Sequence, residues 1–230
     1  LRRTVAAAEN WLVYGGAYNN QRYSALDQIT RENVSDLVPV WVYQTGIAES
    51  FSTTPIVVDN TMYVTTPESG VVALNAATGE RLWEFRPELR SVALCCGPNN
   101  RGVAAYGDRV YVATLDARLI ALNNRTGEVI WDIEVADPED GHSITMAPLA
   151  YAGKVVVGTS GADYGIRGFV SAYDATNGSL VWRWYTIPEP GEVPNGWWGT
   201  WAETDPFGTP VNRNIIRERE DSARYPEAWR

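Results

Sequence analysis

A motif that recurs three times constrains this chain more than any other feature. It occurs as ALNAATGERLW, ALNNRTGEVIW and AYDATNGSLVW, with the final tryptophans at Trp83, Trp131 and Trp182. These tryptophans lie 48 and then 51 residues apart. In each copy a glycine stands four residues before the tryptophan, where a tight turn with positive φ would reverse the chain between two strands. The motif therefore predicts a chain built from similar β units.

A segment rich in β-forming residues precedes each motif. The three segments are PIVVDNTMYVTT, GVAAYGDRVYVAT and APLAYAGKVVVGT, with predicted turns of their own at Asp59-Asn60, Gly107-Asp108 and Gly153-Lys154. Each unit thus holds about four antiparallel strands. A repeat of roughly 40 to 50 residues with four strands is typical of a blade of a β-propeller, with the tryptophan as a wedge between neighbouring blades. The predicted fold class is all-β, a propeller of four-stranded blades.

The number of repeats indicates an incomplete ring. At this period 230 residues hold fewer than five units, and the sequence from Pro188 onward shows no blade pattern. LVPVWVYQTG around Trp41 resembles the end of a degenerate earlier unit. Propellers close with about four to eight blades. We expect residues 1–230 to form a partial propeller domain of about the first four blades, with the rest of the ring missing.

Two insertions interrupt the repeat. Val156 and Ala172 of the third unit are 16 residues apart, whereas the equivalent pairs of the first two units, Tyr63 and Ala73 and Tyr111 and Ala121, are 10 residues apart. The extra length falls in TSGADYGIRG, residues 159–168. Loops that interrupt a repeat commonly carry the functional site. This one offers the hydroxyl of Ser160, backbone amides around Gly161 and the carboxylate of Asp163, which suit an anion and a hard cation. An ordinary polar loop is the alternative.

The second insertion, between Trp83 and Val103, contains Arg101 and the two cysteines of the chain, Cys95 and Cys96. Adjacent cysteines allow three interpretations. They can be free buried thiols, they can share a soft metal with further ligands, or they can form a strained disulfide in an oxidising compartment.

Composition excludes some classes of function. The formal charge of −9 and the pI of about 4.7 argue against a nucleic-acid partner, whose phosphates would be repelled. No apolar run reaches the roughly 18 to 20 residues that span a bilayer.

Together, CCGPNNRG, the TGxxxW blade endings, ITMAP and TSGADYGIRGFVSAYDATNG resemble the pyrroloquinoline quinone (PQQ)-dependent alcohol dehydrogenases. The opening segment WLVYGGAYNNQRYSALDQITRENV is also similar to that family, so the resemblance covers most of residues 10–230. It implies an eight-bladed propeller secreted to the periplasm, with the quinone near its axis. The adjacent cysteines, Cys95 and Cys96, would form a vicinal disulfide that packs against one face of the cofactor.

The resemblance also implies roles for the residues of the two insertions and of ITMAP. Arg101 would pair with a carboxylate of PQQ, because a guanidinium binds a carboxylate with two hydrogen bonds. Thr145 would hydrogen-bond the cofactor. The residues expected to hold its carboxylate edge are Ser160, Gly161 and Ala162.

Asp163 would bind the metal, Ca²⁺ or a lanthanide, that polarises the quinone. The best-known members have Glu at this position, so the shorter Asp changes the metal distance or identity. A second departure is Ser52, which stands where the family often has Glu; Glu49 lies three residues away.

The implied reaction is oxidation of an alcohol, or of a sugar, with hydride passing to the quinone and electrons leaving to a cytochrome c. The catalytic aspartate, an asparagine metal ligand and the tryptophan beneath the quinone are expected downstream of residue 230, so this chain alone is predicted to be inactive. We interpret Trp197, Trp198 and Trp201 as packing or loop residues. The alternative is a non-catalytic PQQ-repeat propeller that acts as a protein-interaction scaffold.

Overall fold

The computed structural model describes residues 10–18, 20–90, 94 and 96–187. The chain divides into two units, residues 1–186 and Ile187–Arg230, and nearly all of the second lies outside the described residues. The features below belong to the first unit.

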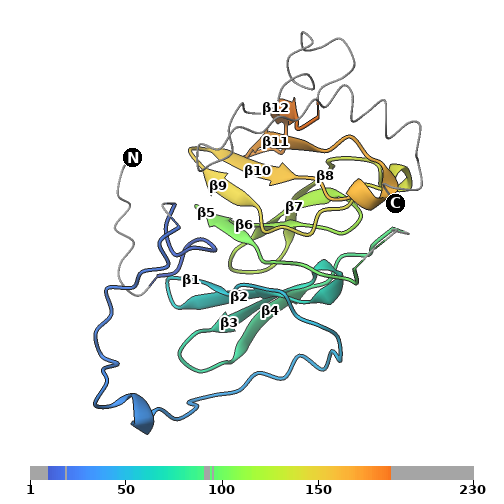
Figure 1. Cartoon of the computed structure of the whole chain (residues 1–230). Coiled ribbons are helices and arrows are strands. Elements are labelled where there is room, and N and C mark those ends of the chain that lie inside the picture. The colour runs from blue at the N-terminus through green and yellow to red at the C-terminus, as the bar shows by residue number, and fades with distance from the viewer. Residues whose placement is uncertain (1–9, 19, 91–93, 95, 188–230) are drawn as a thin grey trace, which may run out of the picture. The chain divides into compact units, whose positions relative to one another are not determined.

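Three four-stranded antiparallel sheets, each with its strands in chain order, form the described part of the chain (Figure 1). The first sheet comprises β1 (Ile56–Val58), β2 (Thr61–Thr65), β3 (Val71–Asn75) and β4 (Arg81–Phe85). The second comprises β5 (Ala104–Tyr106), β6 (Arg109–Ala113), β7 (Arg118–Asn123) and β8 (Val129–Glu134). The third comprises β9 (Leu149–Tyr151), β10 (Lys154–Gly158), β11 (Phe169–Asp174) and β12 (Leu180–Tyr185). These are the predicted units, and the all-β class is confirmed.

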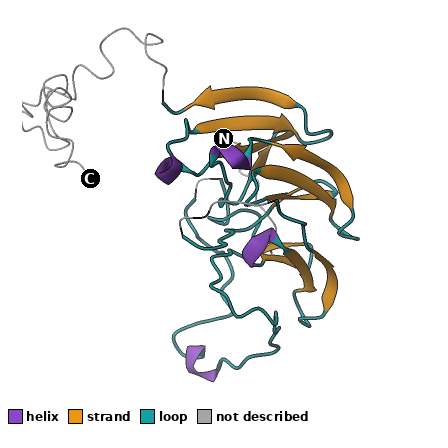
Figure 2. Cartoon of the chain, turned by 90° about the vertical axis from the view of Figure 1, so that its right-hand side faces the viewer, coloured by secondary structure: helices purple, strands orange, loops and turns teal. Residues whose placement is uncertain are grey.

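Helical structure in the described residues is limited to short 3₁₀ turns. They are η1 (Val34–Asp36), η2 (Pro67–Ser69), η3 (Pro138–Asp140) and η4 (Ala162–Tyr164). Figure 2 shows η2, η3 and η4 on the same side of the three sheets as the long loops. Among the described residues, no helix is long and apolar enough to cross a membrane.

The turns of the three motifs have the predicted geometry. Gly79, Gly127 and Gly178 have φ angles of 72°, 74° and 74°. In each turn the side chain of the preceding Asn or Asp accepts a hydrogen bond from the backbone, as with Asn75 Oδ1 and the N–H of Ala77 (2.9 Å). One turn prediction was wrong by a residue: the turn between β9 and β10 is formed by Ala152 and Gly153, and Lys154 already begins β10.

The tryptophans join each sheet to the next. Trp83 donates from Nε1 to the carbonyl of Asn124 in the second sheet (3.0 Å), and a Cβ added to Gly127 would lie 2.6 Å from its ring. A side chain at Gly127 would therefore displace the indole. The same two contacts link Trp131 to Ala175 and Gly178, and Trp41 to Ala76 and Gly79. Trp41 thus makes the contacts expected at the end of an earlier unit.

The inner strands of the second sheet, β6 and β7, are buried on both faces. Along β6, Val110 and Val112 belong to the core shared with the first sheet, whereas Tyr111 and Ala113 belong to the core shared with the third. A strand covered on both faces is expected to be hydrophobic throughout rather than alternating. The sequence RVYVA has this character.

The insertion in the third unit lies wholly in a loop. Val156 of β10 pairs with Ala172 of β11, as Tyr111 pairs with Ala121 in the second sheet. The extra residues therefore extend the connection from β10 to β11 and leave the strand register unchanged.

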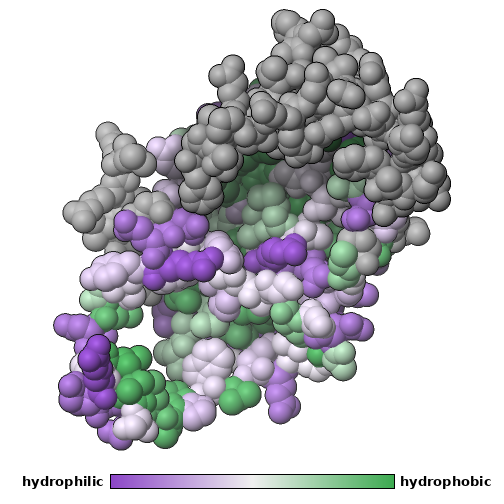
Figure 3. All heavy atoms as spheres, in the orientation of Figure 1, coloured by the Kyte–Doolittle hydropathy of each residue, from purple (hydrophilic) through white to green (hydrophobic). Residues whose placement is uncertain are grey.

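The segment before the first sheet has little regular structure and exposes apolar side chains. Val38, Val40 and Val42 are 75%, 85% and 77% exposed. Figure 3 shows hydrophobic side chains on the surface in the part of the chain that carries η1. Trp11 joins this segment to the first sheet through an antiparallel bridge to Val57.

Candidate functional site

The two insertions meet at one pocket of about 180 Å³. Its lining residues are Leu94, Cys96, Gly97, Asn99, Arg101, Ser143, Thr145, Ser160, Gly161, Asp163 and Tyr164. Six residues predicted for the site, from three separate segments, are therefore brought together. Ala162, also predicted, belongs to η4 beside the pocket and does not line it, and Cys95 lies outside the described residues.

A chain of hydrogen bonds crosses the pocket from one insertion to the other. Arg101 donates from Nη1 to the hydroxyl of Thr145 (2.7 Å) and to its carbonyl (3.2 Å). The Thr145 hydroxyl lies 3.2 Å from that of Ser160. The backbone supports this arrangement, since the N–H of Arg101 also donates to the carbonyl of Thr145 (3.1 Å). One cation and two hydroxyls thus converge on the same space.

The cysteine insertion is held in place by a side chain that the sequence interpretation missed. Asn99 donates from Nδ2 to the carbonyl of Cys96 (2.6 Å), and its Oδ1 accepts from the hydroxyl of Ser52 (2.9 Å). The only signal for Asn99 was its place within CCGPNNRG. Cys96 is disulfide-bonded in this structure.

The loop of the third sheet depends on glycine at one position. Gly161 has a φ of 139°, and a Cβ there would lie 2.2 Å from the carbonyl oxygen of Gly141. Ser160 and Ser143 exchange two backbone hydrogen bonds, of 2.9 and 2.7 Å, beside this contact. The amide of Ser160 is therefore used within the protein, and Ser160 offers the pocket its hydroxyl instead.

Asp163 is exposed at the rim of the pocket, within η4. Within residues 10–18, 20–90, 94 and 96–187, no group of three or more His, Cys, Asp or Glu side chains could hold a metal ion. Asp163 can supply one oxygen ligand of the kind that hard cations prefer. A complete metal site is not formed by the described residues.

The single histidine of the chain, His142, lies next to Ser143 in the sequence. Its Nδ1 is buried without a hydrogen-bond partner, and its ring packs against Phe169 with centroids 5.7 Å apart. Burial lowers the pKa of His142, with a further contribution from the positive charge of Arg183, against the opposing effect of Asp140. The imidazole is therefore neutral at pH 7.

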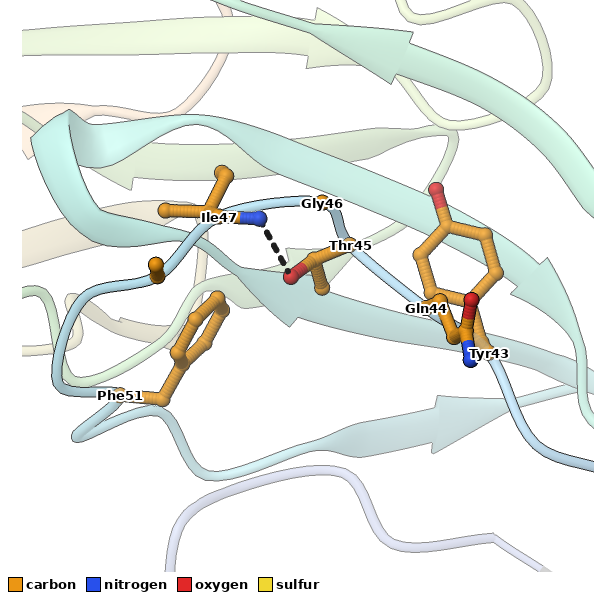
Figure 4. A pocket seen from close by; sticks show the side chains of 7 residues that line it. Tyr43, Gln44, Thr45, Gly46, Ile47 and Phe51 are labelled. Atoms are coloured by element: carbon orange, nitrogen blue, oxygen red, sulfur yellow. Dashed lines mark hydrogen bonds between the residues drawn. The ribbon is translucent and has the colours of Figure 1, made fainter.

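A second hollow, of about 520 Å³, follows the segment before the first sheet (Figure 4). It is lined by residues 43–48 and Phe51, none of them charged. The hydrogen bond drawn there joins the N–H of Ile47 to the hydroxyl of Thr45 (3.3 Å). This hollow lacks the converging polar groups that the pocket around Arg101 contains.

Comparison with protein families gives one match that covers most of the chain. The model described as PQQ, the glucose/ethanol/alcohol dehydrogenase β-propeller domain, matches residues 11–212. Among curated proteins, the quinohemoprotein alcohol dehydrogenase ADH IIB of Pseudomonas putida is 45% identical over 197 residues, which cover 84% of this chain and 29% of that protein. The quinohemoprotein alcohol dehydrogenase of Comamonas testosteroni is 41% identical over 198 residues, covering 84% of this chain and 28% of the relative.

Solved structures agree with these relatives. The quinohemoprotein alcohol dehydrogenase ADHIIG of Pseudomonas putida HK5 superposes with a TM-score of 0.78 at 41% identity, covering 81% of this chain and 28% of that one. A europium-containing methanol dehydrogenase superposes with a TM-score of 0.76 at 38% identity, covering 80% of this chain and 33% of that one. The chain spans 26% to 29% of the length of the curated relatives it matches.

Proposed function

The chain belongs to the family of the PQQ glucose/ethanol/alcohol dehydrogenase β-propeller domain, and from this premise we propose that it is the N-terminal part of the propeller of a periplasmic quinoprotein dehydrogenase. The whole protein would oxidise an alcohol with PQQ and a metal ion, and a sugar is the second candidate substrate. It would pass the electrons to a cytochrome c or a quinone. Relatives named as quinohemoprotein alcohol dehydrogenases and as a 1-butanol dehydrogenase (cytochrome c) support this proposal.

The observation that carries the proposal is the convergence of Arg101, Thr145 and Ser160 on one pocket. A guanidinium forms charge-assisted hydrogen bonds with a carboxylate, and two hydroxyls can donate to further acceptor oxygens. This donor set fits the carboxylate edge of PQQ. In the free protein the three side chains bond one another, so they are already close together before a ligand arrives.

We assign the binding roles accordingly. Arg101 binds a carboxylate of PQQ, and the hydroxyls of Thr145 and Ser160 hydrogen-bond its polar edge. The backbone of Gly161 and Ala162 binds the same edge of PQQ. Cys96, with Cys95 as its disulfide partner, provides a flat surface for the ring. PQQ when bound supplies the chemistry of hydride acceptance, and these residues bind it and fix its orientation.

Asp163 is the contribution of this chain to a metal site. One carboxylate does not hold a cation alone, and we derive no step through the metal. We expect the remaining ligands and the general base downstream of residue 230, as the resemblance implies. Disulfide bonds persist in oxidising compartments, so the bonded state of Cys96 supports a periplasmic location.

The test is PQQ binding by the whole protein with single substitutions. Arg101→Lys keeps the charge but loses the planar fork, so its Kd for PQQ should rise by at least about tenfold. Binding is followed by quenching of tryptophan fluorescence as PQQ is added with Ca²⁺. Arg125→Lys, on an exposed turn, is the matched control and should bind like the parent. Equal affinity of Arg101→Lys and the parent would contradict the assignment.

Asp163→Asn tests the metal role separately. The substitution removes the charge at constant size, so the affinity of the whole protein for Ca²⁺, measured by calorimetry in the presence of PQQ, should fall at least about tenfold. Excess Ca²⁺ should partly restore activity in the whole protein. Asp108→Asn, whose carboxylate is 80% exposed in another turn, controls for the loss of one surface charge. Unchanged metal affinity in Asp163→Asn would leave Asp163 an ordinary loop residue.

A further inference from the structure

The turn that joins β6 to β7 is buried in a way that its sequence does not suggest. Its four residues, Thr114–Ala117, each have 0% of their surface exposed, including the carboxylate of Asp116. Connections between strands normally run over the surface, and a buried charge is costly unless it is paired and hydrogen-bonded. The pairing of Asp116 therefore indicates what this turn holds together.

Three donors satisfy the Asp116 carboxylate. The hydroxyl of Thr114 donates to Oδ1, and Nε of Arg118 donates to Oδ2 (2.9 Å). The third donor is the backbone N–H of Arg90, which reaches Oδ2 at 3.2 Å. Burial by itself would raise the pKa of Asp116, but the hydrogen bonds from Thr114 and Arg90 and the charge of Arg118 outweigh it and lower that pKa. Asp116 is thus a carboxylate at neutral pH.

Asp116 and Arg118 together fasten the segment that leads into the cysteine insertion. The N–H of Arg90 is bound by Asp116, and Nη2 of Arg118 donates to the carbonyl of Glu88 (2.8 Å). The guanidinium of Arg90 adds a bond from Nη2 to the carbonyl of Asp116 (3.1 Å). Residues 88–90 are therefore fixed to the turn by both backbone and side-chain groups.

The segment that leaves the insertion is fastened at the start of the same turn. Asn100, 2% exposed, donates from Nδ2 to the carbonyl of Ala113 (2.8 Å), the last residue of β6. Its Oδ1 accepts from the N–H of Gly102 (3.1 Å). Arg101 lies between these two residues. Both ends of the cysteine insertion are thus anchored within residues 113–118 of the second sheet.

We propose that Asp116 is a positioning residue for the pocket: through Arg90 and Arg118 it fixes the base of the insertion that places Cys96 and Arg101. Only the choice of PQQ as the ligand rests on the proposed function. The anchoring itself is a property of the protein alone. Asp116 does not line the pocket and acts through the anchored entry segment, residues 88–90.

The experiment compares Asp116→Asn with Asp132→Asn in the whole protein. Asp132 binds the same guanidinium, with Nη1 of Arg118 2.6 Å from its Oδ2, but it is 34% exposed and makes none of the contacts to residues 88–90 described above. Hydrogen exchange read by mass spectrometry reports the peptides that contain residues 88–90 and 100–102. The Kd for PQQ with Ca²⁺ and the melting temperature are measured on the same samples.

In Asp116→Asn, exchange at residues 88–90 should rise at least about tenfold, since the charge-assisted hydrogen bond to the N–H of Arg90 is lost. Exchange at residues 100–102 should rise less, because Asn100 is bound to the carbonyl of Ala113 and not to Asp116. Exchange in β10 and β11 of the third sheet should stay at the parent value. The Kd for PQQ should rise at least about fivefold, whereas Asp132→Asn should match the parent in both measurements. If Asp116→Asn does not fold, Arg118→Lys replaces it, because lysine cannot bind Asp116 and Glu88 together.

Parent-like exchange at residues 88–90 in Asp116→Asn would overturn the proposal. A uniform rise across all three sheets would also overturn it, because it would indicate general destabilisation. A parent protein that binds no PQQ while Asp116→Asn shows the localised exchange would refute the proposed ligand but support the anchoring.

Discussion

The connection between the second and third strands is a turn of four residues in the second sheet, Thr114–Ala117, and a loop of ten residues in the third, 159–168. Each contains one aspartate. Asp116 is fully buried and bound by three donors, whereas Asp163 is exposed at the edge of a pocket. The same position of the repeat is thus a buried, hydrogen-bonded turn in one sheet and an exposed loop that lines a pocket in the next. The difference lies in what covers each connection: the turn after β6 is bound by residues 88–90 and by Ser69.

The largest expected effect is the difference in folding stability between variants of the two aspartates. Asp116→Ala should lower the free energy of unfolding by about 3 kcal/mol, because it leaves the N–H of Arg90 and the guanidinium of Arg118 without their buried partner. Asp163→Ala should change it by less than about 0.5 kcal/mol, as exposed substitutions usually do. Urea unfolding followed by tryptophan fluorescence measures both. Similar costs for the two variants would remove the distinction between anchor and surface loop.

A smaller effect separates two glycines within the long loop. Gly161→Ala should cost about 2 kcal/mol, because its φ of 139° and the 2.2 Å approach to the carbonyl of Gly141 both exclude a Cβ. Gly165→Ala should cost about 1 kcal/mol, since φ is 75° but no atom lies within 4 Å of the added Cβ. Gly161→Ala should also weaken PQQ binding. Thermal unfolding and PQQ titration of both variants check this order, and equal losses would show that the close contact is unimportant.

The smallest expected effect is the contribution of His142 to the pH dependence of stability. Its Nδ1 has no hydrogen-bond partner, in contrast to the carboxylate of Asp116. Its pKa is lowered in the folded state, mainly by burial, so the unfolded chain binds the proton more tightly. The stability that this neutral histidine contributes is complete above the ordinary pKa of about 6.5. It is lost as pH falls from that value through the lowered pKa.

His142 is the one histidine in the sequence, so its ring protons give a single NMR titration, expected to have its midpoint below the ordinary value. His142→Leu should remove this part of the pH dependence of the melting temperature. A midpoint at or above the ordinary histidine pKa would contradict the buried, neutral state.

The sequence predicted the features that depend on neighbouring residues. The spacing from Gly127 to Trp131 and the β-rich runs before it were sufficient to place four strands in each unit. The turn at Ala152 was missed because a non-glycine residue takes a φ of 48° there. For the site, the resemblance identified Arg101, Thr145 and Ser160, and the structure places all three at one pocket.

The remaining features depend on contacts between distant residues. Nothing in TLDARL predicts that Asp116 is buried, because the groups that bind this turn come from distant positions: the N–H of Arg90, 26 positions earlier, donates to Asp116, and the hydroxyl of Ser69 accepts from the N–H of Leu115. The amide of Ser160 donates to the carbonyl of Ser143 in another segment, a pairing that the sequence of the loop does not predict. Asn99 links Cys96 to Ser52, which stands 47 residues away. No local pattern contains these pairings.

The contact between a tryptophan and the glycine of the following motif also sets an order in time. A chain that emerges from a ribosome, or through a membrane pore, does so from its N-terminus, and Trp83 leaves 44 residues before its partner Gly127. Trp131 likewise leaves 47 residues before Gly178. Strands pair within microseconds, far faster than a polypeptide of this length is made. Each newly formed sheet therefore leaves one face of its tryptophan side chain exposed to water until the next sheet has formed. The contacts between sheets then form at the rate at which the chain emerges, one sheet behind the emerging end.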